Sequence, residues 1–258
     1  MADGINFARK KYGLRIVEAY FESPAENPFP YCDIYIVLQS PTSEGSSTPY
    51  KTLHIDLNKP IDSIWSGFRA NTKNEINRSS QRDNIIIEIH RSPSAEVINE
   101  FLSFYNEFAK KKKINPANKH RLSALFEKNG FTIAFARNEL GLLLVVHGYI
   151  TLNKRSRLLY SGSCFDAKND RAFNALAGRA NRNLTWECIK YFKSFKNAIY
   201  DFGGISDGGT QMLVNIDDFK RSFGGSDVVE YNHYILRSAI AKTAFKILSV
   251  LRRSRFEG

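Results

Sequence analysis

Three pairs of glycines lie within residues 198–225, AIYDFGGISDGGTQMLVNIDDFKRSFGG, and this stretch constrains the fold and the chemistry of the chain most. A short apolar run ends at Asp201, Gly203 and Gly204 follow at once, and a short helical pattern carries Lys220 before the third pair. Glycine accepts positive φ and lets a ligand's backbone or phosphate approach closely. A buried strand that ends in a carboxylate and a glycine loop is a common way to build a site in α/β proteins. We therefore predict a site here, with a set of tight turns as the alternative.

The composition is that of a folded protein with a basic surface. The chain has 258 residues, enough for one large domain or two small ones, and 43% of them are hydrophobic, which supports a core and argues against disorder. The formal net charge of +11 suggests a polyanionic partner: nucleic acid, a phosphorylated ligand or an anionic lipid surface. Solubility alone is the alternative explanation of this charge.

The cysteines and the N-terminus bear on the compartment. Cys32, Cys164 and Cys188 lie far apart, share no metal-ligand spacing, and are typical of buried apolar residues in a reducing compartment. We predict no metal site. The first residues, MADGINFARKKYG, contain no apolar segment typical of a signal peptide, and no apolar run approaches the ~18 residues of a membrane span. We expect a cytoplasmic protein.

Hydrophobic periodicity predicts alternating strands and helices. The predicted strands span 31–38, 51–57, 84–90, 131–137, 142–151, 157–165, 198–202 and 228–236. The predicted helices span 61–76, 95–110, about 119–129, a long segment that ends near Lys196, a short one around Lys220, and 237–253. Because the connections after 137 and 151 are short, the three strands around them are predicted to form an antiparallel meander.

This order of elements from residue 84 onward resembles that of the GNAT acyltransferases. Four segments sharpen the resemblance to the Fem group of GNAT-fold aminoacyltransferases: FRANTKNEINRS at 68–79, NRNLTWECIKYF at 181–192, YDFGGI at 200–205 and DDFKRSFGG at 217–225. The resemblance covers roughly residues 60–235 and implies an α/β (α+β) fold with a mixed sheet, an antiparallel meander and flanking helices. The chain has room for one such domain, whereas peptidoglycan-branching Fem enzymes carry two.

The expected organisation has three parts. Residues 84–236 form the GNAT-like core, and residues 1–83 pack on it as a layer of strands and a helix. Residues 237–258 form a basic amphipathic helix, which either packs back on the core or contacts the anionic inner face of a membrane.

The family resemblance also implies a function. It implies transfer of an acyl or aminoacyl group to an amino group of a cell-envelope or polysaccharide precursor, the acceptor being a phosphorylated, lipid-linked or nucleotide-linked amino sugar or peptide. The implied donor is acyl-CoA or aminoacyl-tRNA. A tRNA-dependent aminoacyltransferase is one alternative. A nucleic-acid-binding protein without enzymatic activity is the other, supported by the net charge and by 13% aromatic residues.

Three residues are candidates for the chemistry of transfer. Asp201 could bind the acceptor amine or orient a base, or it could cap the glycine turn that follows it. His147 is the only imidazole in the meander, and its ordinary pKa suits a base near neutrality. Tyr160 could act as an acid or as an oxyanion partner. Structural roles for His147 and Tyr160 remain open.

Two sets of residues are candidates for binding. The GNAT pyrophosphate motif is half present: Gly178, Arg179 and Ala180 match its end, Ala175 stands where a polar residue is usual, and Arg182 adds charge. If Gly178 opens a helix, the N–H groups of that helix start can hold the pyrophosphate of the donor. On the acceptor side, the resemblance points to four residues, the first and last as phosphate binders: Arg69, Gly203, Gly204 and Lys220.

Overall fold

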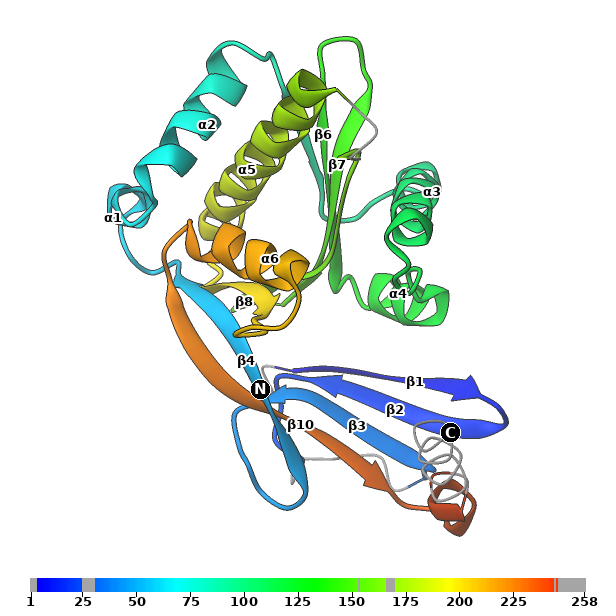
Figure 1. Ribbon diagram of the computed structural model, residues 1–258. Coiled ribbons are helices and arrows are strands. Elements are labelled where there is room, and N and C mark those ends of the chain that lie inside the picture. The colour runs from blue at the N-terminus through cyan, green and yellow to red at the C-terminus, as the bar shows by residue number, and fades with distance from the viewer. Residues whose placement is uncertain (1–3, 25–30, 153, 166–169, 244, 246–258) are drawn as a thin grey trace. The chain divides into compact units, whose positions relative to one another are not determined.

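The computed structural model describes residues 4–24, 31–152, 154–165, 170–243 and 245 (Figure 1). It divides into two compact units, which are described separately below. One unit combines Met1–Tyr50 with Val229–Gly258, and the other is Lys51–Val228. Strands β4 (Ser47–Asp56) and β10 (Ser226–Leu236) each carry residues of both units.

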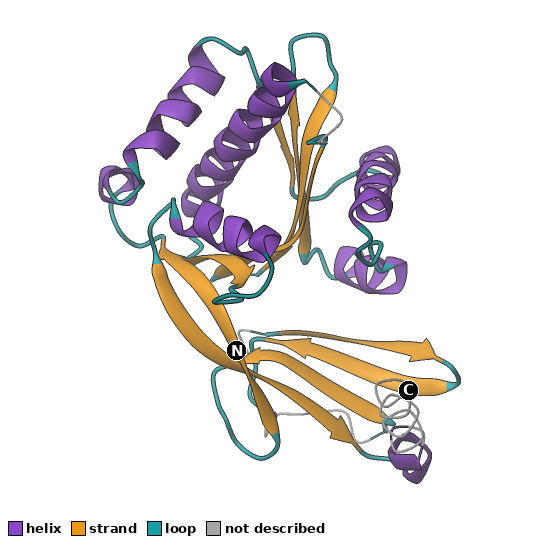
Figure 2. Cartoon of the chain, in the orientation of Figure 1, coloured by secondary structure: helices purple, strands orange, loops and turns teal. Residues whose placement is uncertain are grey.

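The unit Lys51–Val228 is built on a mixed sheet with helices on both faces (Figure 2). Its strands follow the order β4-β9-β8-β7-β6-β5, and all neighbours pair antiparallel except β8 and β9, which are parallel. The remaining strands are β5 (Ile86–His90), β6 (Phe131–Arg137), β7 (Leu143–Thr151), β8 (Arg155–Ser163) and β9 (Ile199–Gly204). The helices are α1 (Ile61–Ser66), α2 (Ala70–Gln81), α3 (Ala95–Lys112), α4 (Lys119–Glu127), α5 (Arg171–Ser194) and α6 (Gln211–Arg221). The predicted order of elements and the antiparallel meander are confirmed.

Strand β7 shows how the sheet separates two layers of helices. Successive side chains of a strand point to opposite faces. Tyr149 packs against Phe192 of α5, with ring centroids 4.9 Å apart. Gly148 faces α3, and a Cβ atom there would lie 3.0 Å from the ring of Phe101. Helices α3 and α4 therefore cover one face of the sheet and α5 covers the other, with α2 packed along α5 (Figure 1).

The apolar stripe predicted over residues 61–76 is buried, but it belongs to two helices. Ile64, Phe68 and Ile76 join a core cluster with residues of the sheet and α5. Helix α1 ends at Ser66, and Arg69 has the extended angles φ −60° and ψ 147°, so the chain turns before α2 begins. The three apolar side chains remain on the buried side in spite of this break.

The other unit is a sheet with the order β1-β2-β3-β10. It comprises β1 (Ile5–Lys11), β2 (Leu14–Tyr20) and β3 (Ile34–Ser40) with β10, and its buried cluster contains Val17, Ala19, Cys32, Tyr35 and Val37. Sequence analysis did not predict β1 and β2. Their two-residue turn has positive φ at Tyr12 (51°) and Gly13 (79°), the backbone that a tight hairpin requires.

The division of the chain differs from the predicted boundaries at residues 83 and 236. Residues 51–83 lie in the same unit as the meander, and the end of the chain groups with residues 1–50. Of the predicted C-terminal helix, residues 239–243 are helical, while residues 244 and 246–258 lie outside the described part. Among the described residues, no helix combines the length and apolar character needed to cross a membrane.

Candidate active site

Strands β8 and β9 pair over a short length and then separate. Their pairs are Arg155 with Ile199, Ser156 with Tyr200, and Arg157 with Asp201, and within the described residues the ladder ends there. Strand β8 nevertheless continues to Ser163 and β9 to Gly204. Beyond the last pair, the described residues show no further pairing between the two strands, and unpaired backbone N–H and C=O groups at a strand edge are suited to pairing with a ligand.

Asp201 lies at the point where the two strands separate, and it is completely buried. Its Oδ2 accepts hydrogen bonds from Arg155, from Nη2 at 2.5 Å and from Nε at 3.1 Å. Its Oδ1 accepts one from the hydroxyl of Thr52 at 2.5 Å and one from the backbone N–H of Gly203 at 2.8 Å. The bond to Gly203 is the turn cap foreseen as the alternative role of Asp201. Its part in transfer stays a prediction.

The electrostatics of this cluster keep Asp201 ionised. Burial by itself raises the pKa of the carboxyl, but the charge of Arg155 holds the pKa well below its ordinary value. Arg155 also donates from Nη2 to Nε2 of His54 at 2.9 Å. An anion this strongly held is a poor proton acceptor, so Asp201 is better suited to fix Arg155 and the Gly203 turn than to act as a base.

Lys220 lies on α6 and reaches the end of β9. Its Nζ donates to the backbone carbonyl of Gly204, which is the last residue of that strand. Burial lowers the pKa of Lys220 to about 8, while the negative charges of Asp217 and Asp201 act in the opposite direction. The structure thus brings together four predicted site residues: Asp201, Gly203, Gly204 and Lys220. A cation stands beside the separated strands, where it can meet a negative charge on a ligand.

The three glycine pairs differ in why glycine is needed. Gly203, within β9, and Gly208 and Gly209, in the loop after β9, have positive φ. Gly224 and Gly225 also have positive φ, and their Cβ atoms would lie 2.9 Å from the carbonyl oxygen of Gly67 and 2.5 Å from that of His54. The close approach at the third pair is therefore one between segments of the chain itself.

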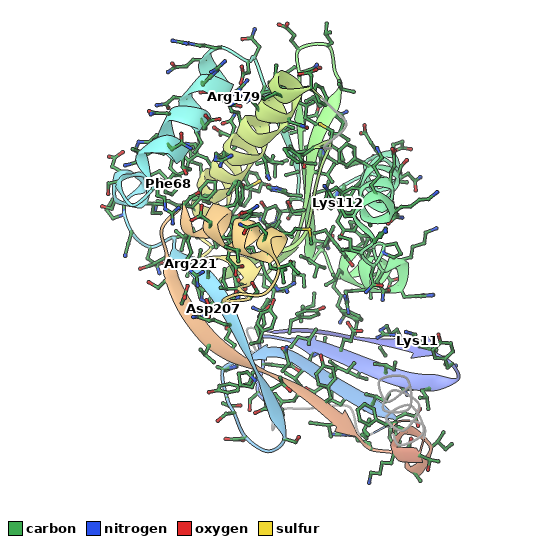
Figure 3. The ribbon with its side chains drawn as sticks, in the orientation of Figure 1. Lys11, Phe68, Lys112, Arg179, Asp207 and Arg221 are labelled. Carbon is green, nitrogen blue, oxygen red and sulfur yellow. The ribbon has the colours of Figure 1, made fainter. Side chains whose placement is uncertain are left out.

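Short-range ion pairs and hydrogen bonds hold the loop between β9 and α6. Asp217 accepts from the backbone N–H groups of Ser206 and Asp207, at 3.0 and 3.1 Å. Asp207 in turn pairs with Lys51 and with Arg221, the latter at 2.7 Å (Figure 3). The loop that carries the second glycine pair is thus tied to the middle and the C-terminal end of α6, which fixes the helix that presents Lys220.

His147 is buried in the core on the α5 face of the sheet. It lies 2.9 Å from the hydroxyl of Tyr149 through Nδ1 and 2.8 Å from Oδ1 of Asn181 through Nε2. The hydroxyl of Tyr149 lies 3.0 Å from that of Tyr200. Burial lowers the pKa of His147 to about 4, so the ring is neutral at pH 7. These contacts support the structural role that sequence analysis left open.

Tyr160 lies on the other face of the sheet. It stands opposite Gly148 in the ladder, packs its ring 4.8 Å from that of Tyr105 of α3, and accepts a hydrogen bond from the backbone N–H of Asn118 at 3.1 Å. The sheet therefore separates Tyr160 from His147. The two residues cannot act on one substrate atom in this arrangement, although their catalytic roles stay untested one by one.

The prediction that Gly178 opens a helix is wrong. Helix α5 begins at Arg171 with Asp170 as its cap, so the N–H groups near Gly178 belong to the helix interior. Ala180 is buried in the core, and Arg179 pairs with Asp83 at 2.5 Å. The motif placed the helix start at Gly178, which is too late. The segment before Gly178 is rich in alanine, which favours helix, and it already belongs to α5.

The other two arginines foreseen as binders have contacts on α6. Arg182 donates to the carbonyl of Gly178 at 3.2 Å and lies over the ring of Phe219, 5.3 Å from its centroid. Arg69 is exposed and pairs with Asp218 at 2.6 Å. Asp218 and Lys220 are two residues apart in α6, which places them on opposite sides of the helix. Arg69 is therefore not part of the cluster around Lys220.

Sequence analysis missed the partners of Asp201. Arg155 follows a short turn at the start of β8, and Thr52 and His54 lie in β4. These residues meet Asp201 only because β4 and β8 both pair with β9. Arg155 is 46 positions from Asp201 in the sequence, and Thr52 is 149 positions from it. The available signal was in the second half of β4, where the polar residues Thr52 and His54 alternate with apolar ones.

Fold and geometry together define the class of architecture: a GNAT-like acyltransferase fold, with a central mixed sheet whose parallel strands separate beside a glycine loop. Comparison with protein-family models and with curated protein sequences gives no match.

Solved structures with the same fold are numerous, and three of them, at low sequence identity, are described here. The crystal structure of FemX matches with a TM-score of 0.58 and 12% identity, covering 76% of this chain and 63% of that one. The C-terminal domain of a putative lysylphosphatidylglycerol synthetase from Agrobacterium fabrum matches with 0.57 and 11%, covering 96% and 86%. The L-PGS structure from Bacillus licheniformis matches with 0.56 and 13%, covering 97% and 86%. The chain thus spans less than two thirds of FemX but most of the other two.

Proposed function

We propose that this protein transfers an acyl or aminoacyl group to an amino group of a cell-envelope or polysaccharide precursor, with acyl-CoA or aminoacyl-tRNA as the donor. The observation that carries the proposal is the position of Lys220, whose ammonium group reaches the end of β9 beside the separated strands. The chain shares its fold with FemX and with a putative lysylphosphatidylglycerol synthetase, whose name denotes a lysyl group joined to a membrane lipid, and this likeness supports an envelope acceptor by analogy.

The geometry suggests what each group does during transfer. The open edge of β8 beyond Arg157 can hold a linear donor arm by backbone hydrogen bonds, which places its carbonyl near the end of β9. When the amine attacks that carbonyl, negative charge develops on the carbonyl oxygen, and the ammonium of Lys220 can stabilise it. Asp201 and Arg155 hold the Gly203 turn in place. No enzyme nucleophile is needed, because the amine attacks the donor directly. As the new C–N bond forms, the C–S bond of acyl-CoA or the ester C–O bond of aminoacyl-tRNA breaks, and the free thiol or ribose hydroxyl leaves with the proton that the amine loses.

The test is a transfer assay that separates the two donors. The full chain is incubated with an extract of envelope precursors and either a labelled acyl-CoA mixture or tRNA charged with labelled amino acids. Label should appear in amide linkage with one of the donors, and ribonuclease should abolish it if the donor is aminoacyl-tRNA. If neither donor gives protein-dependent amide product while nucleic acid binds with a steep salt dependence, the proposal is wrong and the protein is a nucleic-acid-binding module.

A further inference from the structure

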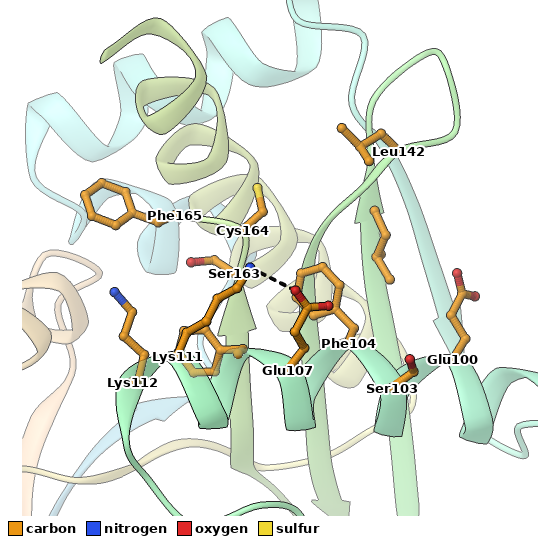
Figure 4. A pocket seen from close by; sticks show the side chains of 12 residues that line it. Glu100, Ser103, Phe104, Glu107, Lys111, Lys112, Leu142, Ser163, Cys164 and Phe165 are labelled. Carbon is orange, nitrogen blue, oxygen red and sulfur yellow. Dashed lines mark ion pairs between the residues drawn. The ribbon is translucent and has the colours of Figure 1, made fainter. Parts of the chain in front are cut away.

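A groove runs along α3 on the face of the sheet opposite α5, and none of the predicted site residues lines it. It has a volume of about 550 Å³ and is bounded by one side of α3, the start of β7 and the end of β8 (Figure 4). Its lining from α3 begins at Glu100 and ends at Lys112. At 1.5 Å per residue that length is roughly 18 Å, so the groove is elongated.

The walls of the groove are mainly apolar. Phe104 and Phe108 of α3 form one side, Leu142 and Leu143 close it at the β7 end, and Phe165 lies beyond the end of β8. Leu142 and Phe165 are 50% and 48% exposed, although a large apolar side chain usually gains by burial. An apolar ligand would bury the exposed side chains of Leu142 and Phe165, and an elongated ligand would match the shape of the groove.

The charged groups at the groove differ in whether they already have partners. Glu100 pairs with Arg137 at 2.6 Å, and Glu107 pairs with Lys111 at 2.9 Å. Among the described residues, Lys112 has no carboxylate partner, and its Nζ lies 5.6 Å from the ring centroid of Phe165. Within the described part of the chain, the positive charge at the groove that has no carboxylate partner is that of Lys112, at the end formed by Lys112 and Phe165.

We propose that this groove binds an amphipathic molecule, a linear apolar chain that ends in a carboxylate or phosphate, with the chain along Phe104 and Phe108 and the anionic group at Lys112. The site is separate from the cluster of Lys220 and Asp201. Ser163 of β8 lines the groove, and Arg155, at the other end of the same strand, belongs to the Asp201 cluster. The two residues are eight positions apart, a distance along the strand of roughly 26 Å at 3.3 Å per residue. The proposal does not depend on the proposed transferase activity.

The groove contains its own reporter, the thiol of Cys164, which is partly exposed. Cys32 and Cys188, the other two cysteines, are 9% and 0% exposed. The experiment measures alkylation of Cys164 in the full chain by N-ethylmaleimide, peptide by peptide, with sodium decanoate below its micelle concentration as the probe and decanol as the uncharged comparison. Decanoate should slow the reaction saturably and bind more tightly than decanol.

Matched variants locate the two halves of the ligand. Lys112→Gln should weaken decanoate protection about fivefold, the range of one partly exposed ion pair, and leave decanol unchanged. Lys110→Gln removes the same charge from the same helix outside the groove and should have no effect. Leu142→Glu should abolish protection by both molecules, whereas Leu140→Glu, at an 86% exposed position of the same turn, should abolish neither.

Several results would overturn the proposal. Decanoate that gives no saturable protection of Cys164 would exclude the site, because Cys164 is one of the residues that line the groove. Equal protection by decanoate and decanol, or equal loss in Lys110→Gln and Lys112→Gln, would exclude the assignment of the anionic group to Lys112. Equal loss in Leu140→Glu and Leu142→Glu would show that binding takes place elsewhere.

Discussion

Arg155 and Asp201 form a buried ion pair in which two N–H groups of the guanidinium, Nη2 at 2.5 Å and Nε at 3.1 Å, donate to one carboxylate oxygen. This ion pair joins Arg155, which stands in the first ladder pair of β8 and β9, to Asp201, which stands in the last. It explains how one carboxylate can be fully buried and still ionised: a fixed cation replaces water around it.

Removing the carboxylate charge should therefore destabilise the fold. Asp201→Asn leaves the guanidinium of Arg155 buried without its counter-charge, and we expect the free energy of unfolding to fall by about 3–5 kcal/mol. Asp218→Asn is the control, because Asp218 is exposed and pairs with Arg69 at the surface; its effect should lie within about 1 kcal/mol. Urea unfolding followed by tryptophan fluorescence is suitable, since Trp65 and Trp186 both lie in the unit Lys51–Val228. Equal effects of the two substitutions would contradict this account of the pair.

His147 should make the unit sensitive to acid. Its pKa is about 4 in the folded protein and about 6.5 in an unfolded chain, so the unfolded chain binds more protons between these values. The free energy of unfolding should therefore decrease as the pH falls from 6.5 to 4, by about 3 kcal/mol from this residue. His147→Gln should remove that part of the pH slope, and His120→Gln, at an exposed position, should retain it. An unchanged slope in His147→Gln would show that the ring is not held neutral.

The third glycine pair should matter more for folding than the second. In Gly225→Ala the new methyl group would lie 2.5 Å from the carbonyl oxygen of His54, in a residue with φ of 91°. In Gly208→Ala the φ of 134° is also unfavourable, but nothing lies within 4 Å. We expect losses of about 3 kcal/mol or more for Gly225→Ala and of about 1–2 kcal/mol for Gly208→Ala. Both free energies of unfolding are measured with urea. If the two variants lose similar amounts, backbone strain alone accounts for the need for glycine at both positions, and the close contact of Gly225 with His54 has no effect.

The local part of the structure could be predicted from the sequence. The meander follows from alternating apolar residues and short connections, and β6 begins and ends where periodicity places it, at residues 131 and 137. The cap of Asp201 on Gly203 is also local, since the two residues are two positions apart.

The remaining features depend on contacts between distant segments. No pattern in the sequence pairs Asp201 with Arg155, and nothing in a strand pattern shows that His147 and Tyr160 lie on opposite faces until the register of β7 and β8 is known. The start of α5 was misplaced because Gly178 resembles a helix start, although the helix continues through it. In the hairpin of β1 and β2, the apolar residues of β1, Ile5 and Phe7, are too few to show a clear period, and in β2 the consecutive Ile16 and Val17 interrupt a strict alternation.

Lys220 should combine a cost in stability with a benefit in activity. Burial lowers its pKa to about 8, so keeping it protonated at pH 7 disfavours the folded state. That cost is full below pH 8 and disappears as the pH rises toward 10.5, the value in the unfolded chain. Lys220→Met should therefore raise the free energy of unfolding at pH 7 by about 1–2 kcal/mol, less any loss from the bond to Gly204. A stabilised protein that no longer transfers would indicate a functional residue, and a destabilised one would indicate a structural residue.

The central claim is that the ammonium of Lys220 stabilises the charge that develops during acyl transfer. Its most direct test is the single-turnover rate of amide formation, with saturating donor, in the wild type, Lys220→Gln and Lys190→Gln; Lys190 is a surface residue paired with Glu187 on α5. We predict that Lys220→Gln lowers this rate by on the order of a hundredfold or more, the range for loss of one oxyanion-stabilising group, while Lys190→Gln retains it. A folded Lys220→Gln protein that forms product at the wild-type rate would contradict the claim.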